Sequence, residues 1–201
     1  MARIETPWGP WDAAPLGDVV ELMRGLTAPW WVAGGYAIEL AVGRAYREHG
    51  DVDVGLLRRD RLAVRRLLAG WDVHLAVAGT LAPWPLDEDL PGNVHDIWVR
   101  EHPGGPWRFQ LMLDEADGDE WVYRRDARIR RPLAGLTLEE DGFRRLAPEV
   151  QLLYKATGTR PKDEADLEAV LPLLSPAQRR WLDEALRTEH TVHPWCAAVA
   201  A

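Results

Sequence analysis

The sequence predicts an α/β fold that is followed by a small helical region. Over residues 1–146, short apolar runs typical of buried strands alternate with segments whose apolar side chains recur at helical spacing. From residue 147 onward, only helical patterns follow. No stretch rich in glycine and serine separates the two parts, so we expect an α/β domain at 1–146 and a helical subdomain at 147–201 that pack together.

The first predicted elements are a helix, a strand and a second helix. Residues 15–26 carry apolar side chains at helical spacing and predict an amphipathic helix. Residues 30–33, Trp-Trp-Val-Ala, are short and apolar and predict a buried strand that stops at a pair of glycines. Residues 36–42 predict a short helix that ends near Gly43, where glycine readily adopts the left-handed conformation of a helix end.

Further strands are expected in the middle of the chain. Acidic and apolar residues alternate from Asp51 to Val54, which predicts a strand with its carboxylates on one face. Asp60 is expected to begin a helix. The other strand candidates, separated by a loop rich in proline and acid at 82–92, are 71–77, 95–99 and 107–113.

The C-terminal part reads as three helices after an arginine-rich stretch of short extended pieces, which runs from Trp121 to Leu146. The helical segments begin with residue types that commonly start helices, including Asp163 and Ser175 as expected N-caps. They cover 148–158, 163–174 and 175–187.

Composition excludes several classes of protein. The 201 residues carry a net charge of −8, which is the wrong sign for a protein that coats nucleic acid through its phosphates. The single cysteine, Cys196, allows neither an intramolecular disulfide nor a cysteine-based zinc site. The first residues include acids where a secretory signal needs a basic start, and the longest apolar stretch, 28–38, is shorter than the ~20 residues that span a bilayer. We therefore expect a soluble, cytoplasmic protein without a membrane partner.

Gly34 and Gly35 stand where a strand is expected to turn into a helix. This geometry lets backbone amides approach a phosphate chain and directs the helix N-terminus at it. A double glycine by itself is as typical of an ordinary turn. The pair therefore indicates a phosphate-binding turn only if other residues of such a site accompany it.

Asp51 and Asp53 are the second feature. Side chains two apart on a strand share a face, so both carboxylates could bind one hard cation, although a solvated strand face is the simpler alternative. The same Asp-x-Asp pattern recurs at 87–89 and 117–119, among prolines, glycines and further acids typical of solvated loops. Only the copy at Asp51 lies within a β-branched alternation that would hold the carboxylates rigidly.

These features together resemble a known signature. A strand ending in two glycines, a short helix, then Arg44, Arg47, His49 and the aspartate pair is similar to the nucleotidyltransferase motif of the DNA polymerase β-like superfamily. The interval from Gly35 to Asp51 matches the longer variant of the aminoglycoside 2''-adenylyltransferase and lincosamide nucleotidyltransferase families. The resemblance is specific over residues 30–57 and diffuse elsewhere. The second glycine departs from the more common Gly-Ser.

The resemblance implies a fold and a reaction. The fold is a mixed sheet flanked by helices. The reaction transfers a nucleoside monophosphate from an NTP, with ATP as the expected donor, to a hydroxyl, using two Mg²⁺ ions held by three carboxylates. Asp51 and Asp53 would bind the ions. We choose Asp114 as the third carboxylate, because Gln110, Met112 and Asp114 share a strand face; Glu115 is the alternative, and a strand-end acid without a role remains open.

Basic residues and His49 complete the candidate site. Arg44 and Arg47 would meet phosphate or pair with surface acids. His49 could be a ligand or a base, and the milder role is a hydrogen bond that orients the aspartates. The chain has only two lysines, Lys155 and Lys162, against 22 arginines. The resemblance places Lys155 at the cleft, in contact with the triphosphate. Two acids beyond it, Asp163 and Asp166, read as helix-start residues rather than ligands.

The tryptophans leave a choice between core residues and a stacking surface. Eleven of them are scattered along the chain, which favours core and rim positions. Four stand near the segments of the expected cleft, namely Trp30, Trp31, Trp107 and Trp121.

The leading hypothesis is an Mg²⁺-dependent nucleotidyltransferase acting on a small molecule such as an aminoglycoside. The acidic loops at 87–89 and 114–120 would attract a polycation, although such loops are usually only solvated. The alternatives are a catalytically silent nucleotide-binding or interaction protein of the same fold, a toxin-type nucleotidyltransferase that modifies tRNA or protein, and a metal-dependent phosphohydrolase. The sequence leaves the acceptor and the oligomeric state open.

Overall fold

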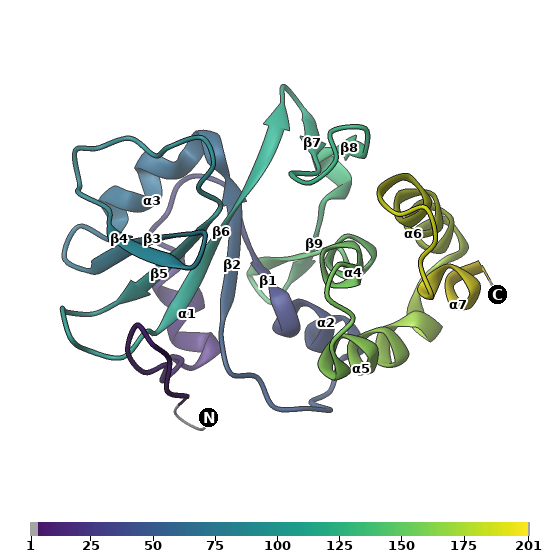
Figure 1. The fold of residues 1–201 in the computed structure, drawn as a ribbon, viewed down its shortest axis with the longest axis horizontal. Helices are drawn as coiled ribbons and strands as arrows, with labels where there is room; N and C mark the ends of the chain where they lie inside the picture. The colour runs from purple at the N-terminus through teal and green to yellow at the C-terminus, as the bar shows by residue number, and fades with distance from the viewer. Residues whose placement is uncertain (1–3, 201) are drawn as a thin grey trace.

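A mixed sheet forms the centre of the molecule in the computed structural model, which describes residues 4–200 (Figure 1). The ten strands within that range follow the order β4-β3-β5-β6-β2-β1-β10-β9, and a hairpin of β7 and β8 extends from β6. The strands are β1 (Trp30–Ala33), β2 (Asp53–Leu57), β3 (Asp72–Val77), β4 (Thr80–Pro83), β5 (Asp96–Arg100), β6 (Phe109–Asp117), β7 (Glu120–Val122), β8 (Arg130–Pro132), β9 (Thr137–Glu140) and β10 (Phe143–Leu146). The α/β prediction and the mixed sheet are thus confirmed.

Helices cover the sheet and extend beyond it. They are α1 (Leu16–Met23), α2 (Gly34–Val42), α3 (Arg61–Leu67), α4 (Pro148–Ala156), α5 (Pro161–Val170), α6 (Pro176–Glu189) and α7 (Trp195–Ala200), with short 3₁₀ turns at Arg58–Asp60, Leu133–Gly135 and Leu171–Leu173. Helices α4 to α7 gather beyond one end of the sheet, on the side of α2 (Figure 1). No helix within residues 4–200 combines the length and the apolar character needed to cross a bilayer.

The pairing of β2, β6 and β5 determines which side chains can meet. Strand β2 runs parallel to β6, with Asp53 opposite Gln110, and β6 runs antiparallel to β5, with Met112 opposite Asp96. Residues directly opposite in neighbouring strands point to the same face. Asp53, Gln110, Met112 and Asp96 therefore share one face of the sheet.

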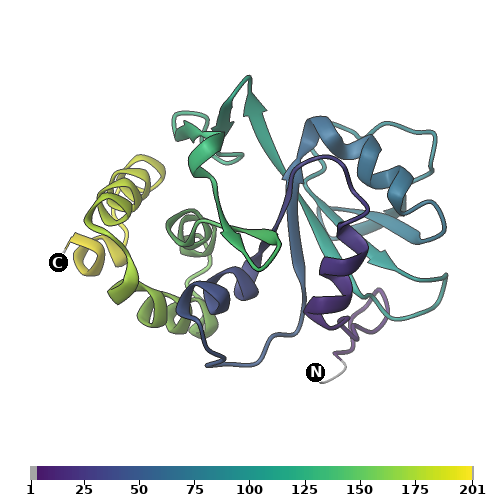
Figure 2. The ribbon, with the colours of Figure 1, turned by 180° about the vertical axis from the view of Figure 1, so that it is seen from behind.

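The opposite face of the same strands is closed by a hydrophobic core. Val54 and Leu56 of β2 and Leu111 and Leu113 of β6 pack with apolar side chains of α1 and α3. Both helices lie on the side of the sheet that faces the viewer in Figure 2. The face that carries Asp53 is thus the one left available for a site.

A second core joins the sheet to the C-terminal helices. It contains Trp31 and Ala33 of β1, Ile38 of α2, Leu152 of α4 and Leu182 of α6, all of them buried. Because this core spans residue 146, the division into domains at 1–146 and 147–201 stays a prediction.

Most predicted elements lie within a few residues of their expected positions, and two short ones were missed. Strand β4 overlaps the expected loop at 82–92 because it pairs with β3 as a tight hairpin through Ala78 and Gly79, both with positive φ. Helix α7 is short and depends on packing of the buried Trp195. Ser175 caps α6 as expected, whereas Asp163 lies at the third position of α5 rather than at its N-cap.

Candidate active site

A polar cavity of about 240 Å³ lies between the sheet and the C-terminal helices. Its walls come from the first turn of α2, the segment that leads into β2, strand β6, the segment after β7, helix α4 and the start of α5. The lining residues are Gly34, Gly35, Arg47, Asp51, Asp53, Gln110, Met112, Arg125, Gln151, Tyr154, Lys155, Arg160 and Lys162. Two carboxylates face five cationic side chains across this space, an arrangement suited to a polyanion bound together with a cation.

Neighbouring side chains approach the backbone of Gly34 and Gly35 so closely that only glycine fits at these two positions. Gly34 has φ +64°, and a Cβ built on it would lie 1.9 Å from Oδ2 of Asp53. A Cβ on Gly35 would lie 2.3 Å from Nη2 of Arg47 and 2.4 Å from Nδ1 of His49. Any side chain at either position would displace groups that line or border the cavity. The predicted turn from strand to helix is present, and α2 begins at Gly34.

The structure brings the predicted aspartate pair into the cavity. Asp53 is the first residue of β2, and Asp51 lies two residues before it. Burial and then the neighbouring Asp51 raise the pKa of Asp53 to about 7, while Lys155 and Lys162 oppose the shift. A buried carboxylate with a raised pKa in a cleft is typical of a functional site. It also provides the oxygen donors that Mg²⁺ prefers.

The structure does not place Asp114 beside this pair. Its register partner in β2 is Leu57, four residues beyond Asp53, which corresponds to roughly 13 Å along the strand. Its carboxylate is 5% exposed and accepts hydrogen bonds from Nε1 of Trp121, at 3.0 Å, and from the hydroxyl of Tyr154. Burial raises the pKa of Asp114, and these two hydrogen bonds oppose the shift. The expected strand face was right, but β2 and β6 are parallel, so the start of β6 and not its end lies next to Asp53.

The alternative third carboxylate, Glu115, lies farther away still. It pairs with Arg58 and with His95, whose Nδ1 is 3.7 Å from its carboxylate. Its strand neighbour is Val122 of β7, in the hairpin that leaves the main sheet. Glu115 therefore does not approach the aspartate pair.

Asp96 is a further carboxylate on this face of the sheet, and the site expected from the sequence did not include it. It begins β5 on the same face as Asp53, two strands across and two residues farther along the register, which corresponds to roughly 12 Å. Its Oδ1 lies 3.4 Å from Nε2 of Gln110 and 3.3 Å from Nη1 of Arg124. The available signal was the alternation of Asp96 and Trp98 with the apolar Ile97 and Val99, the same kind of pattern as at Asp51 to Val54.

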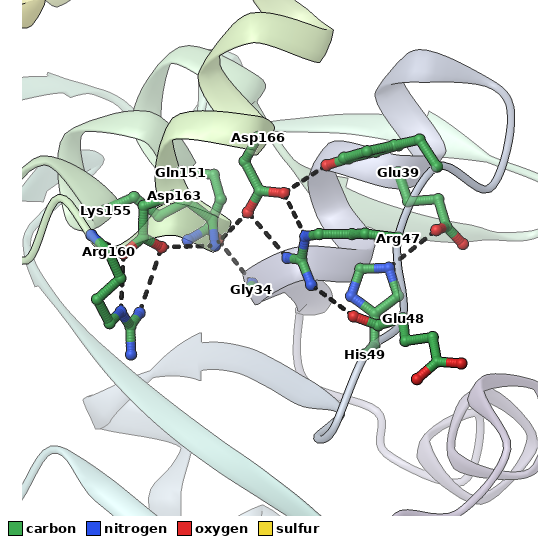
Figure 3. Close-up of polar contacts among 11 residues, drawn as sticks. Gly34, Glu39, Arg47, Glu48, His49, Gln151, Lys155, Arg160, Asp163 and Asp166 are labelled. Carbon is green, nitrogen blue, oxygen red and sulfur yellow. Dashed lines mark hydrogen bonds and ion pairs between the residues drawn. The ribbon is translucent and has the colours of Figure 1, made fainter. Parts of the chain in front are cut away.

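Lys155 lines the cavity and is held in a buried ion-pair network (Figure 3). Its Nζ lies 2.7 Å from Oδ2 of Asp166 and 3.5 Å from Oδ1 of Asp163. Asp166 also accepts from Nε of Arg47 at 2.6 Å and from the hydroxyl of Tyr46 at 2.5 Å. Burial acts against these partners, yet their hydrogen bonds lower the pKa of Asp166. Asp166 is therefore not a helix-start residue. Its carboxylate is the shared partner of Lys155, Arg47 and Tyr46 at the edge of the cavity.

Asp163 combines a helix-start role with a place in this network. Its Oδ2 accepts from the backbone N–H of Arg160 at 3.1 Å and from Nε of Arg160 at 2.7 Å. The fully buried Asp163 and Asp166 thus hold Lys155 and Arg47 at the edge of the cavity.

His49 and Arg44 take other positions than expected. The 7% exposed His49 bonds through Nε2 to Oε2 of Glu39 at 2.9 Å and stacks on Tyr36 at 4.1 Å between ring centroids. Burial lowers the pKa of His49, although the bond to Glu39 opposes this, so the ring is neutral near pH 7. It supports helix α2 and does not contact the aspartates. Arg44 is exposed and lies outside the lining of the cavity.

Three further residues line the cavity that were not among the site residues expected from the sequence. Oε1 of Gln151 accepts the backbone N–H of Gly34 at 2.7 Å, which connects α4 to the first turn of α2. Arg125 reaches the cavity from the segment after β7 and is held by the carbonyl of Tyr154 at 3.0 Å and by Oγ1 of Thr157. Arg160 enters from the turn before α5. Only the Arg-x-Lys-Asp run at 160–163 offered a signal for the last of these.

Asp51 and Asp53 are the carboxylates of the cavity that could hold a divalent cation. Among residues 4–200, no three His, Cys, Asp or Glu side chains come together as a ready metal cluster. Asp51 and Asp53 nevertheless supply carboxylate oxygens, and the backbone of Gly34 lies so close to the Asp53 carboxylate that a Cβ on Gly34 would not fit. This chemistry fits Mg²⁺ with the remaining positions taken by phosphate or water.

Comparisons with known proteins give a family match over part of the chain and several similar folds. The family model of aminoglycoside-2''-adenylyltransferase matches residues 15–79. The lincomycin-bound lincosamide antibiotic adenylyltransferase LnuA is similar in structure with a TM-score of 0.53 and 14% identity, over 79% of this chain and 96% of that one. No curated protein sequence matches the chain significantly.

Antibiotic-resistance factor ANT(2'')-Ia is similar in two further structures. Its solution structure gives a TM-score of 0.57 and 16% identity over 88% of this chain and 91% of that one. Its complex with adenylyl-2''-tobramycin gives a TM-score of 0.53 and 15% identity over 86% of this chain and 95% of that one. At these identities the structures establish a shared fold, and the family match adds the segment that holds the glycine and aspartate pairs. The chain thus shares the fold of these adenylyltransferases, and its residues 15–79 match the aminoglycoside-2''-adenylyltransferase family model.

Proposed function

We propose that the protein transfers AMP from ATP, with Mg²⁺, to a hydroxyl of a small molecule of the kind that antibiotic adenylyltransferases modify. The observation that carries the proposal is the cavity in which Asp51 and Asp53 face Arg47, Arg125, Lys155, Arg160 and Lys162. The similar proteins are adenylyltransferases, and two of their structures contain lincomycin or adenylyl-2''-tobramycin, which supports an adenylyl donor and an antibiotic acceptor. We place the reaction in the cytoplasm, which supplies ATP and Mg²⁺.

In this proposal the carboxylates hold the cation and the basic residues hold the phosphates. Asp51 and Asp53 bind Mg²⁺, whose chemistry is to neutralise the charge of the triphosphate during transfer. The backbone of Gly34 and Gly35 approaches the phosphate chain at the start of α2. Arg160, the N-cap of α5, and Lys162, in its first turn, contact the leaving pyrophosphate, and Lys155 contributes its charge from the border of the cavity.

Asp96 takes the role of third carboxylate in place of Asp114. It shares the sheet face of Asp53 and stands on the far side of Gln110, where an acceptor would approach the nucleotide. In this position its carboxylate accepts the proton of the attacking hydroxyl, which moves from the acceptor oxygen to the carboxylate as the bond to the α-phosphorus forms.

Mass spectrometry tests the proposal directly. A panel of hydroxyl compounds is incubated with the protein, ATP and Mg²⁺, and the expected result is an AMP adduct together with released pyrophosphate. The double variant Asp51→Asn, Asp53→Asn should lose this activity. Its matched control is Asp117→Asn, Asp119→Asn, the same change at the same spacing in the β6–β7 hairpin, and it should retain the activity.

Other outcomes would reject the proposal in distinct ways. Release of free phosphate without an adduct would indicate a phosphohydrolase. AMP found on tRNA or protein rather than on a small molecule would indicate a toxin-type enzyme. Nucleotide binding without turnover of any acceptor would indicate a silent member of the fold.

A further inference from the structure

A second cavity, of about 340 Å³, adjoins the proposed nucleotide site on the same face of the sheet. Gln110 lines both cavities, and Asp96 lines the second one. The other lining residues come from the N-terminal segment, from β5 and from the β3–β4 hairpin, namely Trp8, Ala76, Ala78, Gly79, Thr80, Leu81 and Trp98. A molecule in this space would lie beside the position that we assign to the reacting phosphate.

Two indoles give this second cavity an apolar wall. Trp98 stands on the same strand face as Asp96 and is fixed by edge contacts with Trp11 at 5.0 Å and Trp107 at 5.5 Å between ring centroids. Trp8 meets Trp98 edge-on at 5.9 Å and remains 40% exposed. The main chain of Trp8 is anchored, because its carbonyl accepts Nε1–H of Trp107 at 2.9 Å. These side chains are therefore held in place before any ligand arrives.

The charge of the cavity is low. Among its lining residues within the described chain, Asp96 is the one carboxylate, and Arg124 already lies 3.3 Å from it. The remaining lining side chains are aromatic, aliphatic or hydroxyl-bearing, apart from Gln110. A polycationic acceptor would have to leave most of its charges unpaired against this surface, which is costly when they lose water.

The acidic loops that would attract a polycation lie elsewhere. Asp89 pairs with Arg61, and both Asp117 and Glu120 pair with Arg130. None of these acids lines either cavity.

We infer that the acceptor is a small molecule of low charge that places an apolar ring face against Trp8, Trp98 and Leu81 and directs a hydroxyl toward Asp96. This rests on the proposed function and names its substrate class. It replaces the aminoglycoside-like acceptor expected from the sequence.

The test compares two acceptors and two matched variants. Lincomycin, which carries an apolar alkylated ring and little charge, and tobramycin, a polycation, are each offered with ATP and Mg²⁺ alongside a wider set of hydroxyl compounds of both kinds. The expected wild-type result is an AMP adduct on apolar-faced compounds and a lower kcat/KM for tobramycin. Leu81→Asp should raise the acceptor KM by about tenfold or more, the factor typical of one lost apolar contact in a substrate pocket.

Leu86→Asp is the control for Leu81→Asp, because Leu86 is 41% exposed on the following loop and lines neither cavity. It should leave the acceptor KM unchanged. Trp8→Ala provides a second test with little risk to folding, since its side chain is already partly exposed and its anchoring carbonyl is retained; it too should raise the acceptor KM by about tenfold. Both pocket variants should leave the KM for ATP unchanged.

Binding of a fluorescent ATP analogue with Mg²⁺, measured without acceptor, separates this inference from the proposed function. Absence of that binding would reject the nucleotidyltransferase proposal itself. If the analogue binds, a preference for tobramycin, equal KM values in Leu81→Asp and Leu86→Asp, or no modification of any apolar-faced compound would overturn the inference about the acceptor.

Discussion

At the scale of a single residue, the environment of Asp53 opposes the ionised state that its proposed role requires. The proposed reaction needs its carboxylate ionised, while burial and the charge of Asp51 raise its pKa from 3.8 to about 7. Because the folded state then holds a proton that the unfolded state releases, Asp53 makes the folded protein less stable as pH rises from about 4 to about 7. A bound cation would remove this penalty.

The corresponding prediction concerns Asp53→Asn. Without metal, the variant should be more stable than the wild type at pH 8, by roughly 2–4 °C in Tm for each kcal/mol of repulsion removed, and the difference should vanish near pH 4. Thermal unfolding followed by circular dichroism at both pH values measures this. Added Mg²⁺ should raise the Tm of the wild type and not that of the variant. A variant less stable than the wild type at pH 8 would contradict the electrostatic account.

Asp96 and Asp114 should behave in opposite ways. Asp96→Asn is expected to lower kcat by about 10²–10⁴, the range for loss of a general acid–base group, with little change in Tm. Asp114→Asn should keep most of the activity. It should cost about 1–3 kcal/mol of stability, because the hydrogen bonds from Trp121 and Tyr154 lose a carboxylate acceptor and the new amide N–H₂ group is buried in place of Oδ2.

Steady-state kinetics and urea unfolding of the two variants separate these roles. The reverse pattern, with activity lost in Asp114→Asn and retained in Asp96→Asn, would restore the assignment made from the sequence.

At the scale of elements, the site depends on how α2, α4 and α5 are tied together. Gln151 of α4 accepts the first N–H of α2, and Asp166 of α5 holds Arg47 and Lys155 from two other segments. Helix propensities cannot produce this arrangement. It depends on the helices packing so that charges from three segments lose their water together.

Asp166→Ala should therefore destabilise the protein strongly. Removing the fully buried carboxylate leaves Lys155 and Arg47 without their shared partner, for which an effect of about 3–5 kcal/mol is expected. Urea unfolding measures it. The matched control is Asp183→Ala, which removes a helical carboxylate that pairs with the exposed Arg187 and should cost less than about 1 kcal/mol. Similar losses in the two variants would contradict the importance of the network.

At the scale of the whole molecule, one apolar core joins the sheet to the C-terminal helices. Side chains of β1 and α2 share it with side chains of α4 and α6. The helical region should thus depend on the sheet for its stability, even though the sequence pattern changes at residue 147.

We expect the chain to unfold in a single cooperative transition. Urea curves followed by far-ultraviolet circular dichroism, which is weighted toward helices, should coincide with curves followed by tryptophan fluorescence, which is weighted toward the sheet. Two separated transitions would instead support the expected domains at 1–146 and 147–201 as independent units.

The sequence by itself determined the order of most elements and the local part of the site. The glycine pair and the aspartate pair lie in short segments whose geometry follows from strand and helix periodicity, whereas Lys155 was expected at the cleft only from the family resemblance. Ser175 as a cap and the strand at 30–33 were predictable for the same reason.

Only the tertiary structure decided which distant residues complete the site. Periodicity tells which side chains of a strand share a face, but not the direction or register in which two strands pair. Parallel pairing of β2 with β6 puts Gln110 rather than Asp114 beside Asp53, and antiparallel pairing brings in Asp96 and Trp98 from β5. The ion pairs of Asp166 likewise arise from packing between segments about 120 residues apart in the chain. Contacts of this range depend on the global balance of burial and chain entropy, which no local pattern encodes.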